Sequence, residues 1–189
     1  MTTQKVIEAW NDAQACDGPC VRSERWYVRK HRWIGRRAKA HGVDMDLACT
    51  VYALMSWNNA VANNDRVFEL WLRTGIVGMF GACERKVRQA ESGDLVGALT
   101  FKNGRKITTF AENLRHPWAF RGATIDRHAG DIVTGDRRTT KNTLARVRGT
   151  GYDLLESFYV EAARQLGVKP HEVQARTWCH RVYCEGMVD

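Results

Sequence analysis

The segment from residue 45 to about 58 constrains the fold most, because a helix over these residues would be apolar on nearly every side. Asp44 stands directly before it, and aspartate is a preferred residue at a helix N-cap. A helix that is apolar all round must be covered by neighbours on all sides. The segment therefore predicts a central buried helix, in which Cys49 acts as a small buried hydrophobe.

Other segments repeat apolar residues at helical spacing and carry helix stop signals at their ends. One stripe takes steps of four, through Leu154, Phe158, Ala162 and Leu166, and Gly167 follows it. We expect these further helices over 64–74, 107–114, 126–133, 154–166 and 170–182. No segment alternates over strand length, and the chain has only three prolines. The fold is predicted to be all-α.

Most of the net charge lies in one segment. The whole chain has a formal charge of +8, and residues 21–42 hold eight basic residues against one acid. Aromatic residues interleave with them, so this segment can dock an apolar stripe while it presents a cationic face. Cationic density of this kind attracts nucleic-acid phosphates, and the alternative is a solvated helix face. We expect Arg36, Arg37 and Lys39 to contact DNA.

A second basic stretch runs from residue 134 to 151 without periodic apolar residues. It is expected to be an exposed loop, and Arg137, Arg138 and Lys141 are its candidate DNA contacts. No apolar run is long enough to span a membrane, and the N-terminus has no apolar signal core. We therefore expect a monomeric cytoplasmic protein without a membrane partner, working in the host cytoplasm if a phage encodes it.

Six cysteines occur in the chain, and two pairs have short spacings. Cys16 and Cys20 form one pair, and Cys179 and Cys184 form the other. The four can meet as a thiolate metal site, although their spacing is looser than that of zinc ribbons. The alternative is that they stay free thiols, as is usual in a chain without a secretion signal.

The candidate chemistry lies between residues 104 and 131. Gly104 precedes a predicted helix, where backbone N–H groups can face a phosphate. Lys106 lies in the first turn of that helix, where the helix dipole and partial burial favour a neutral, nucleophilic amine. Asp126 opens the next helix and can be aimed at the same cleft. Because 20 positions separate them, one helix and a return loop can bring the amine and the carboxylate together.

This pattern, a Gly-x-Lys helix start followed by a hydrophobic-Asp-x-His, resembles the helix-hairpin-helix base-excision DNA glycosylase superfamily. The resemblance covers about residues 43–135. It implies a catalytic role for Lys106, Asp126 and His128, with DNA contacts from Lys102, Gly104 and Arg105. The run Ser56 to Asn59 resembles the segment that fills the hole left by a flipped base, which makes Asn58 and Asn59 wedge candidates.

The superfamily resemblance also sets the expected architecture, two helical lobes flanking a cleft within one functional unit. Residues 43–134 are expected to form one lobe, and 1–42 with 135–189 the other. The sequence departs from the family at Thr100–Gly104, where the usual hairpin proline and first glycine are missing. Its C-terminal part has only two cysteines, so neither an iron–sulfur cluster nor another cofactor is expected.

The expected function is that of a DNA glycosylase-like enzyme acting on a nucleobase flipped out of duplex DNA, with lyase activity through Lys106. Such activity serves DNA repair. One alternative is DNA modification by a transferase of the same fold that substitutes groups on modified thymines, as in some phage relatives. A further alternative is a DNA-binding protein without catalysis, which the altered hairpin keeps open.

Overall fold

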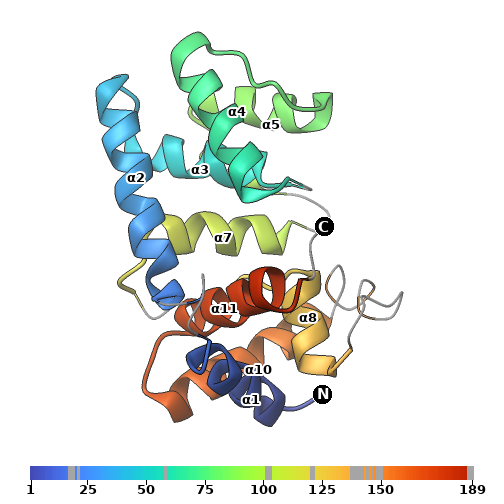
Figure 1. Cartoon of the computed structure of the whole chain (residues 1–189). Helices are drawn as coiled ribbons and strands as arrows, with labels where there is room; N and C mark the ends of the chain where they lie inside the picture. Colours follow the sequence, from blue (N-terminus) through green and yellow to red (C-terminus); the bar gives the residue numbers. More distant parts are fainter. Residues whose placement is uncertain are drawn as a thin grey trace. The chain divides into compact units, whose positions relative to one another are not determined.

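The computed structural model describes residues 1–16, 20, 22–57, 59–100, 104–119, 122–136, 143, 145, 147 and 151–186. Its elements follow one another as α1 (Thr3–Gln14), η1 (Ser23–Arg25), α2 (Trp26–Ala40), α3 (Met45–Met55), α4 (Val61–Thr74), α5 (Gly81–Glu91), α6 (Leu95–Leu99), α7 (Arg105–Arg115), α8 (Arg127–Thr134), α10 (Gly151–Leu166), α11 (Pro170–Cys179) and the π-helical turn η2 (His180–Cys184) (Figure 1). The described residues contain no strand, which confirms the all-α class. No helix among them is long and apolar enough to cross a membrane.

The chain divides into two compact units. Unit 1 combines residues 1–28 with 117–189, and unit 2 is the continuous segment 29–116. This division differs from the expected lobes at two segments. Residues 29–42 belong to unit 2 with the segment that follows them, and residues 117–134 belong to unit 1 with the two ends of the chain. The physical reason is packing: ion pairs attach α2 to α4, whereas α8 packs on α1, α10 and α11.

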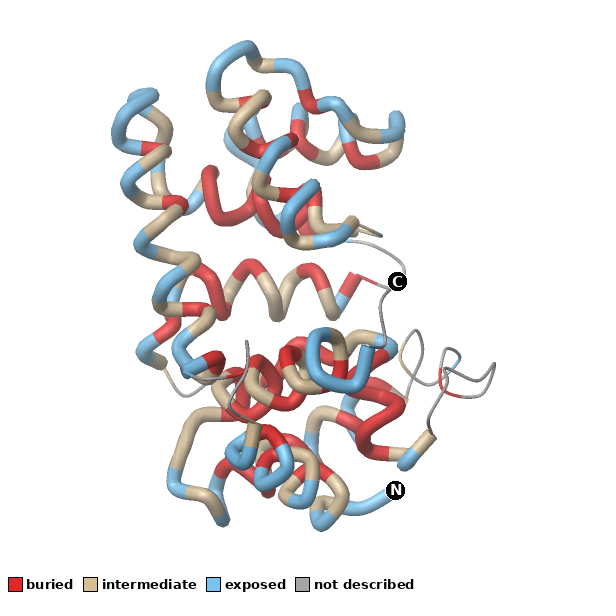
Figure 2. Tube along the Cα trace, viewed as in Figure 1, coloured by how far each residue is buried: buried red, intermediate tan, exposed pale blue. Residues whose placement is uncertain are grey.

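Unit 2 is built around α3, as the apolar sequence predicts. Every residue of α3 from Ala48 to Met55 is buried (red in Figure 2), and α4, α5, α6 and α7 pack against it. Asp44 caps this helix through its carboxylate, which accepts hydrogen bonds from the N–H groups of Asp46 and Leu47 at 2.8 and 3.1 Å. Cys49 is fully buried, as expected.

Unit 1 has a separate core between α1, α8, α10 and α11. Tyr152 is its polar centre: its hydroxyl accepts a hydrogen bond from the Ile125 N–H at 3.1 Å and donates to the Ala123 carbonyl at 3.2 Å. The buried stripe of α10 runs through Tyr152, Leu155, Tyr159, Ala162 and Ala163.

The predicted stripe on this helix was partly wrong, since Leu154 is 49% exposed and Leu155 and Tyr159 face the core instead. A step of four residues overshoots the helical turn of 3.6 residues, so a strict four-residue stripe drifts around the helix. The residues of a helix that stay on one buried face are instead spaced by a mixture of three and four positions.

Candidate nucleic-acid interface and catalytic residues

The basic residues of α2 fall into two groups with different surroundings. Arg29, Arg32, Arg36 and Lys39 are exposed, and their spacing of three, four and three places them along one face of the helix. Among the described residues, none of the four forms an ion pair with a carboxylate. The stripe of four cations, called the α2 stripe below, therefore presents its charge to solvent. It includes Arg36 and Lys39, two of the predicted DNA contacts.

The second group turns inward. Lys30 donates to both carboxylate oxygens of Asp65, at 2.7 and 2.9 Å, and its side chain is only 10% exposed. Arg37 pairs with Glu69 at 2.6 Å, and its guanidinium lies over the Trp33 ring at 4.0 Å from the centroid. Asp65 and Glu69 both belong to α4, so these ion pairs attach α2 to α4. The structure thus places Arg37, a predicted DNA contact, beside an acid rather than on the α2 stripe.

Lys106 lies in the first turn of α7, as predicted, and is half-buried. Gly104 is buried directly before the helix, and its carbonyl accepts hydrogen bonds from the N–H and hydroxyl of Thr108, at 3.0 and 3.2 Å. Arg105 is exposed. Lys102, the remaining candidate of this segment, lies outside the described residues. The local helix start is therefore the predicted one.

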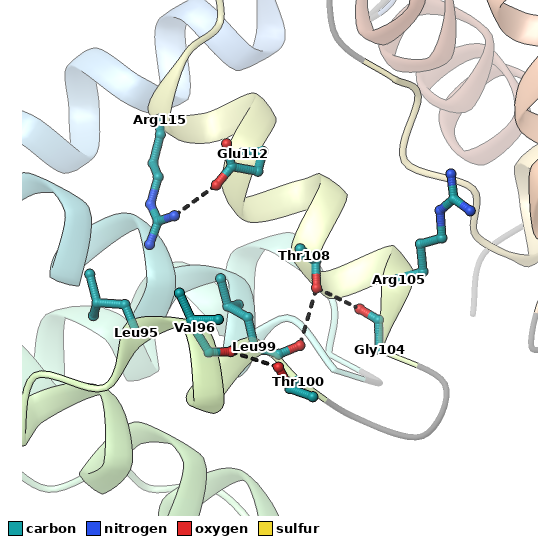
Figure 3. Close-up of a pocket in the computed structure, with 9 residues that line it drawn as sticks. All are labelled: Leu95, Val96, Leu99, Thr100, Gly104, Arg105, Thr108, Glu112 and Arg115. Atoms are coloured by element: carbon teal, nitrogen blue, oxygen red, sulfur yellow. Dashed lines mark hydrogen bonds and ion pairs between the residues drawn. The ribbon is translucent and has the colours of Figure 1, made fainter.

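A hollow of about 320 Å³ lies between α6 and one face of α7, which lines it from the N-cap Gly104 to Arg115 (Figure 3). Its apolar side comes from Leu95, Val96 and Leu99, and its polar side comes from α7. Arg115 closes one end, where it donates to Glu112 at 2.8 Å and to the hydroxyl of Thr50. Figure 3 shows the Arg105 guanidinium directed away from the apolar side. Sequence reasoning missed this hollow because α6, a five-residue helix, carries no periodic pattern.

Asp126 caps α8, as the sequence predicts. Its carboxylate accepts a hydrogen bond from the Ala129 N–H at 2.9 Å, and the residue is half-buried. His128 in the first turn of α8 is only 7% exposed, and its ring stands edge-on to Trp178. Burial lowers the pKa of His128 below its ordinary value of 6.5, although the Asp126 carboxylate acts in the opposite direction. Burial therefore favours the uncharged imidazole at neutral pH.

The three catalytic candidates belong to different units. Lys106 is part of unit 2, whereas Asp126 and His128 are part of unit 1. Within unit 1 the carboxylate and the imidazole are neighbours at the start of one helix. The convergence of the Lys106 amine with the Asp126 carboxylate stays a prediction.

Asn59 lies in the connection between α3 and α4 and is half-buried. Its amide nitrogen donates to the Met55 carbonyl at 3.1 Å, and its amide oxygen accepts from Asn63 at 2.6 Å. Both ends of the amide are thus engaged within unit 2. Its neighbour Asn58 lies outside the described residues, as do Arg137, Arg138 and Lys141 of the second basic stretch.

Three of the four cysteines considered as metal ligands come together. The sulfur atoms of Cys16, Cys20 and Cys184 all lie within 4.8 Å of one another, at one end of the unit 1 helices α1 and η2. Cys179 is buried in α11 and is not part of this group. The sequence spacing suggested the pairing, but only the fold shows which three thiols meet.

Comparisons with known proteins were made for the whole chain. No curated protein and no solved structure matches it. One family model matches residues 1–183, which is nearly the full length, and its description is a family of unknown function, DUF7178. The match includes the α2 stripe, the α7 and α8 helix starts and two of the three clustered cysteines. The chain therefore belongs to the DUF7178 family.

Proposed function

We propose that this protein binds duplex DNA through the α2 stripe. The observation that carries the proposal is the division of the α2 cations into an inner pair neutralised by α4 acids and an outer row of four exposed charges. Over the ten residue steps from Arg29 to Lys39 the row extends about 15 Å, at 1.5 Å per step. Such a row can contact several phosphates, and guanidinium groups bind phosphate oxygens by paired hydrogen bonds.

The aromatic residues of α2 favour duplex over single-stranded DNA. Proteins that bind single strands stack bases on exposed aromatic rings. Trp33 instead packs against Tyr52 and Phe68, with ring centroids 6.1 and 5.8 Å apart, and lies under the Arg37 guanidinium. The α2 stripe itself offers only charged side chains, which suits backbone recognition.

Salt dependence tests this proposal. Four phosphate contacts give a slope of about −3.6 for log K against log salt, because each contact on duplex DNA contributes about −0.9. A variant with Gln in place of Arg29, Arg32, Arg36 and Lys39 is expected to lose most of that slope in an anisotropy titration with a labelled duplex.

The matched control replaces four other exposed arginines with Gln. They lie on α4, α5 and α10, and are Arg66, Arg73, Arg85 and Arg164. Both variants lower the formal charge from +8 to +4. The control is expected to retain most of the wild-type slope. Equal losses in the two variants would contradict a defined interface, and a wild-type slope near zero would contradict DNA binding.

The second candidate function is a glycosylase-like reaction on a base in DNA. It is favoured by the fixed carboxylate of Asp126 beside the buried neutral His128, and by the half-buried Lys106 amine in the first turn of α7. In this reaction the amine attacks C1′ of the deoxyribose while the glycosidic bond breaks and the base leaves. Asp126 stabilises the positive charge that develops on the sugar. The amine loses a proton as it bonds to C1′, the C1′–O4′ bond of the sugar ring then breaks, and O4′ takes up a proton to become the 4′-hydroxyl, which leaves C1′ joined to the lysine as a Schiff base.

Borohydride trapping and nucleoside mass spectrometry test the reaction on duplexes with damaged or modified bases. We expect a trapped protein–DNA adduct with the wild type and none with Lys106→Gln. Asp126→Asn should abolish turnover while DNA affinity changes little, because the carboxylate acts in the transition state. Base release without strand cleavage by Lys106→Gln would instead make water the nucleophile.

Two other outcomes would replace the glycosylase reaction. A nucleoside of altered mass with an intact glycosidic bond would indicate the base-modifying transferase. Salt-dependent binding with neither adduct nor altered nucleoside, across the same substrates, would indicate a DNA-binding protein without catalysis.

A further inference from the structure

Three thiols from opposite ends of the chain meet in unit 1. The sulfur of Cys184 lies 2.7 Å from that of Cys16 and 2.8 Å from that of Cys20. The contacts join residues 168 and 164 positions apart, so the fold rather than local sequence brings them together. All six cysteines of the chain are thiols in this structure, without a disulfide.

Ordered backbone positions each of the three. Cys16 follows the last turn of α1, where the Ala15 N–H still donates to the Asn11 carbonyl at 3.1 Å. Cys20 is fully buried, and its carbonyl accepts hydrogen bonds from the Ser23 N–H at 3.0 Å and the Ser23 hydroxyl at 2.6 Å. Arg22, which lies directly before η1, adopts the left-handed conformation with φ of 62°.

Cys184 is the last residue of the π-helical turn η2. The Glu185 N–H closes this turn by donating to the His180 carbonyl at 3.1 Å. Short π-helical segments interrupt α-helices often at functional sites, since they shift the residues that follow around the axis. Here the turn ends at the cysteine that contacts both others.

A single disulfide would join only two of the three sulfurs and leave the third beside it. A thiophilic divalent metal uses all three. Tetrahedral zinc with bonds of about 2.3 Å holds its sulfur ligands about 3.8 Å apart, so each close pair must open by about 1 Å. Cys16 and Cys184 reach the surface and can move outward, whereas Cys20 is held in its turn.

We propose that Cys16, Cys20 and Cys184 bind a thiophilic divalent metal, with zinc as the expected occupant. Among the residues that the structure describes, no fourth cysteine, histidine or carboxylate joins the group. Three thiolates therefore leave one coordination position for water or an external ligand. The metal connects the end of α1 with η2, and so holds the N- and C-terminal segments of unit 1 together. This inference is independent of the proposed DNA binding.

Metal analysis of the full chain tests the site. The protein is purified under reducing conditions, loaded with zinc chloride, dialysed and assayed for zinc. We expect one zinc per chain in the wild type and none in Cys184→Ser. The control is Cys83→Ser, which changes a buried thiol of unit 2 and should keep the full zinc content. Cobalt loading should give an intense thiolate-to-cobalt absorption band in the wild type and control alone.

A second variant covers the case in which Cys184→Ser does not fold. Cys16→Ser changes a ligand near the surface, and we expect it to lose zinc while keeping its helical circular dichroism. EDTA should lower the thermal midpoint of the zinc-loaded wild type but not that of Cys16→Ser. Folded, reduced wild type without zinc above the buffer blank would overturn the proposal. So would a disulfide that joins Cys184 to Cys16 or Cys20 under reducing conditions.

Discussion

Replacing Lys30 with Met tests whether the inner cations of α2 serve stability rather than binding. The Lys30 ammonium contacts both oxygens of Asp65, and the same carboxylate accepts a hydrogen bond from the Tyr52 hydroxyl at 2.6 Å. The ammonium also lies 4.6 Å from the centroid of the Trp33 ring. Met keeps the apolar stem and a high helix propensity, so the variant removes the charge with little other change.

The expected cost follows from exposure. Breaking a fully buried ion pair costs about 3–5 kcal/mol, and an exposed pair contributes about 0–1 kcal/mol. The Lys30 and Asp65 side chains are 10% and 30% exposed, so the pair lies between these limits. We expect Lys30→Met to lower the free energy of unfolding by about 2 kcal/mol. Urea denaturation followed by circular dichroism measures the change, provided that the m value stays constant.

Arg37→Met is the matched comparison, since it removes the neighbouring pair of the same two helices. Arg37 and Glu69 are 35% and 42% exposed, and its loss should cost below about 1 kcal/mol. The reasoning is refuted if Lys30→Met costs no more than Arg37→Met. If Lys30 serves stability alone, Lys30→Met should leave the salt slope of DNA binding unchanged. A steep fall in that slope would place Lys30 at the interface.

Three further outcomes follow from polar groups of unit 1 that hydrogen-bond within the fold. Burial lowers the pKa of His171 below its ordinary value of 6.5, so the unfolded chain binds a proton more readily. Stability should therefore fall as pH decreases below about 6.5, and His171→Gln should reduce that fall in urea denaturation at about pH 7 and about pH 5.5. Asp126→Ala should lower the free energy of unfolding by about 1 kcal/mol through loss of the α8 cap, and Asp126→Asn should lower it far less; equal costs would contradict the capping role. The Tyr27 hydroxyl lies 2.9 Å from both the Thr124 hydroxyl and the Gln174 amide oxygen, and Tyr27→Phe should cost about 1–3 kcal/mol by the same assay.

Helix ends were predictable because their chemistry is local. Gly75, Gly135 and Gly167 stand just after the helices predicted over 64–74, 126–133 and 154–166, and all three adopt left-handed φ values of 71°, 76° and 68°. A residue with a side chain is strained in that conformation, so the glycine itself is the signal. Pro170 occupies the first turn of α11, where its missing N–H costs nothing.

Polar residues with tertiary partners were misread. A helix was expected over 64–74, which places Asn64 and Asp65 at its start, but α4 begins at Val61. The Asn64 amide instead donates to the Tyr52 carbonyl of α3 at 3.1 Å, and the Asp65 carboxylate accepts a hydrogen bond from the Lys30 ammonium. A cap and a buried hydrogen-bonding residue look the same in sequence, because the choice depends on which helix packs alongside.

The same reason limits what sequence shows of the candidate site. Charge density identified α2, but only the position of α4 separates the cations that are paired from those that face solvent. Likewise, the short spacing between cysteines indicated four candidate metal ligands. Only the fold, which brings the C-terminal segment beside the N-terminal one, shows that three of them meet. Lys106 and Asp126 were located correctly at helix starts, since that placement depends on neighbouring residues alone.

The division of the chain also bears on the order in which it folds during synthesis. Unit 2 is continuous, so its core around α3 can close once residue 116 has left the ribosome. Unit 1 must wait for α10 and α11, although α1 is made first. Until then Val6 and Trp10, which are buried in the finished core, lack the cover that α10 and α11 give them. A nascent chain stalled before residue 151 therefore exposes part of the apolar face of α1, which is the kind of surface that chaperones bind.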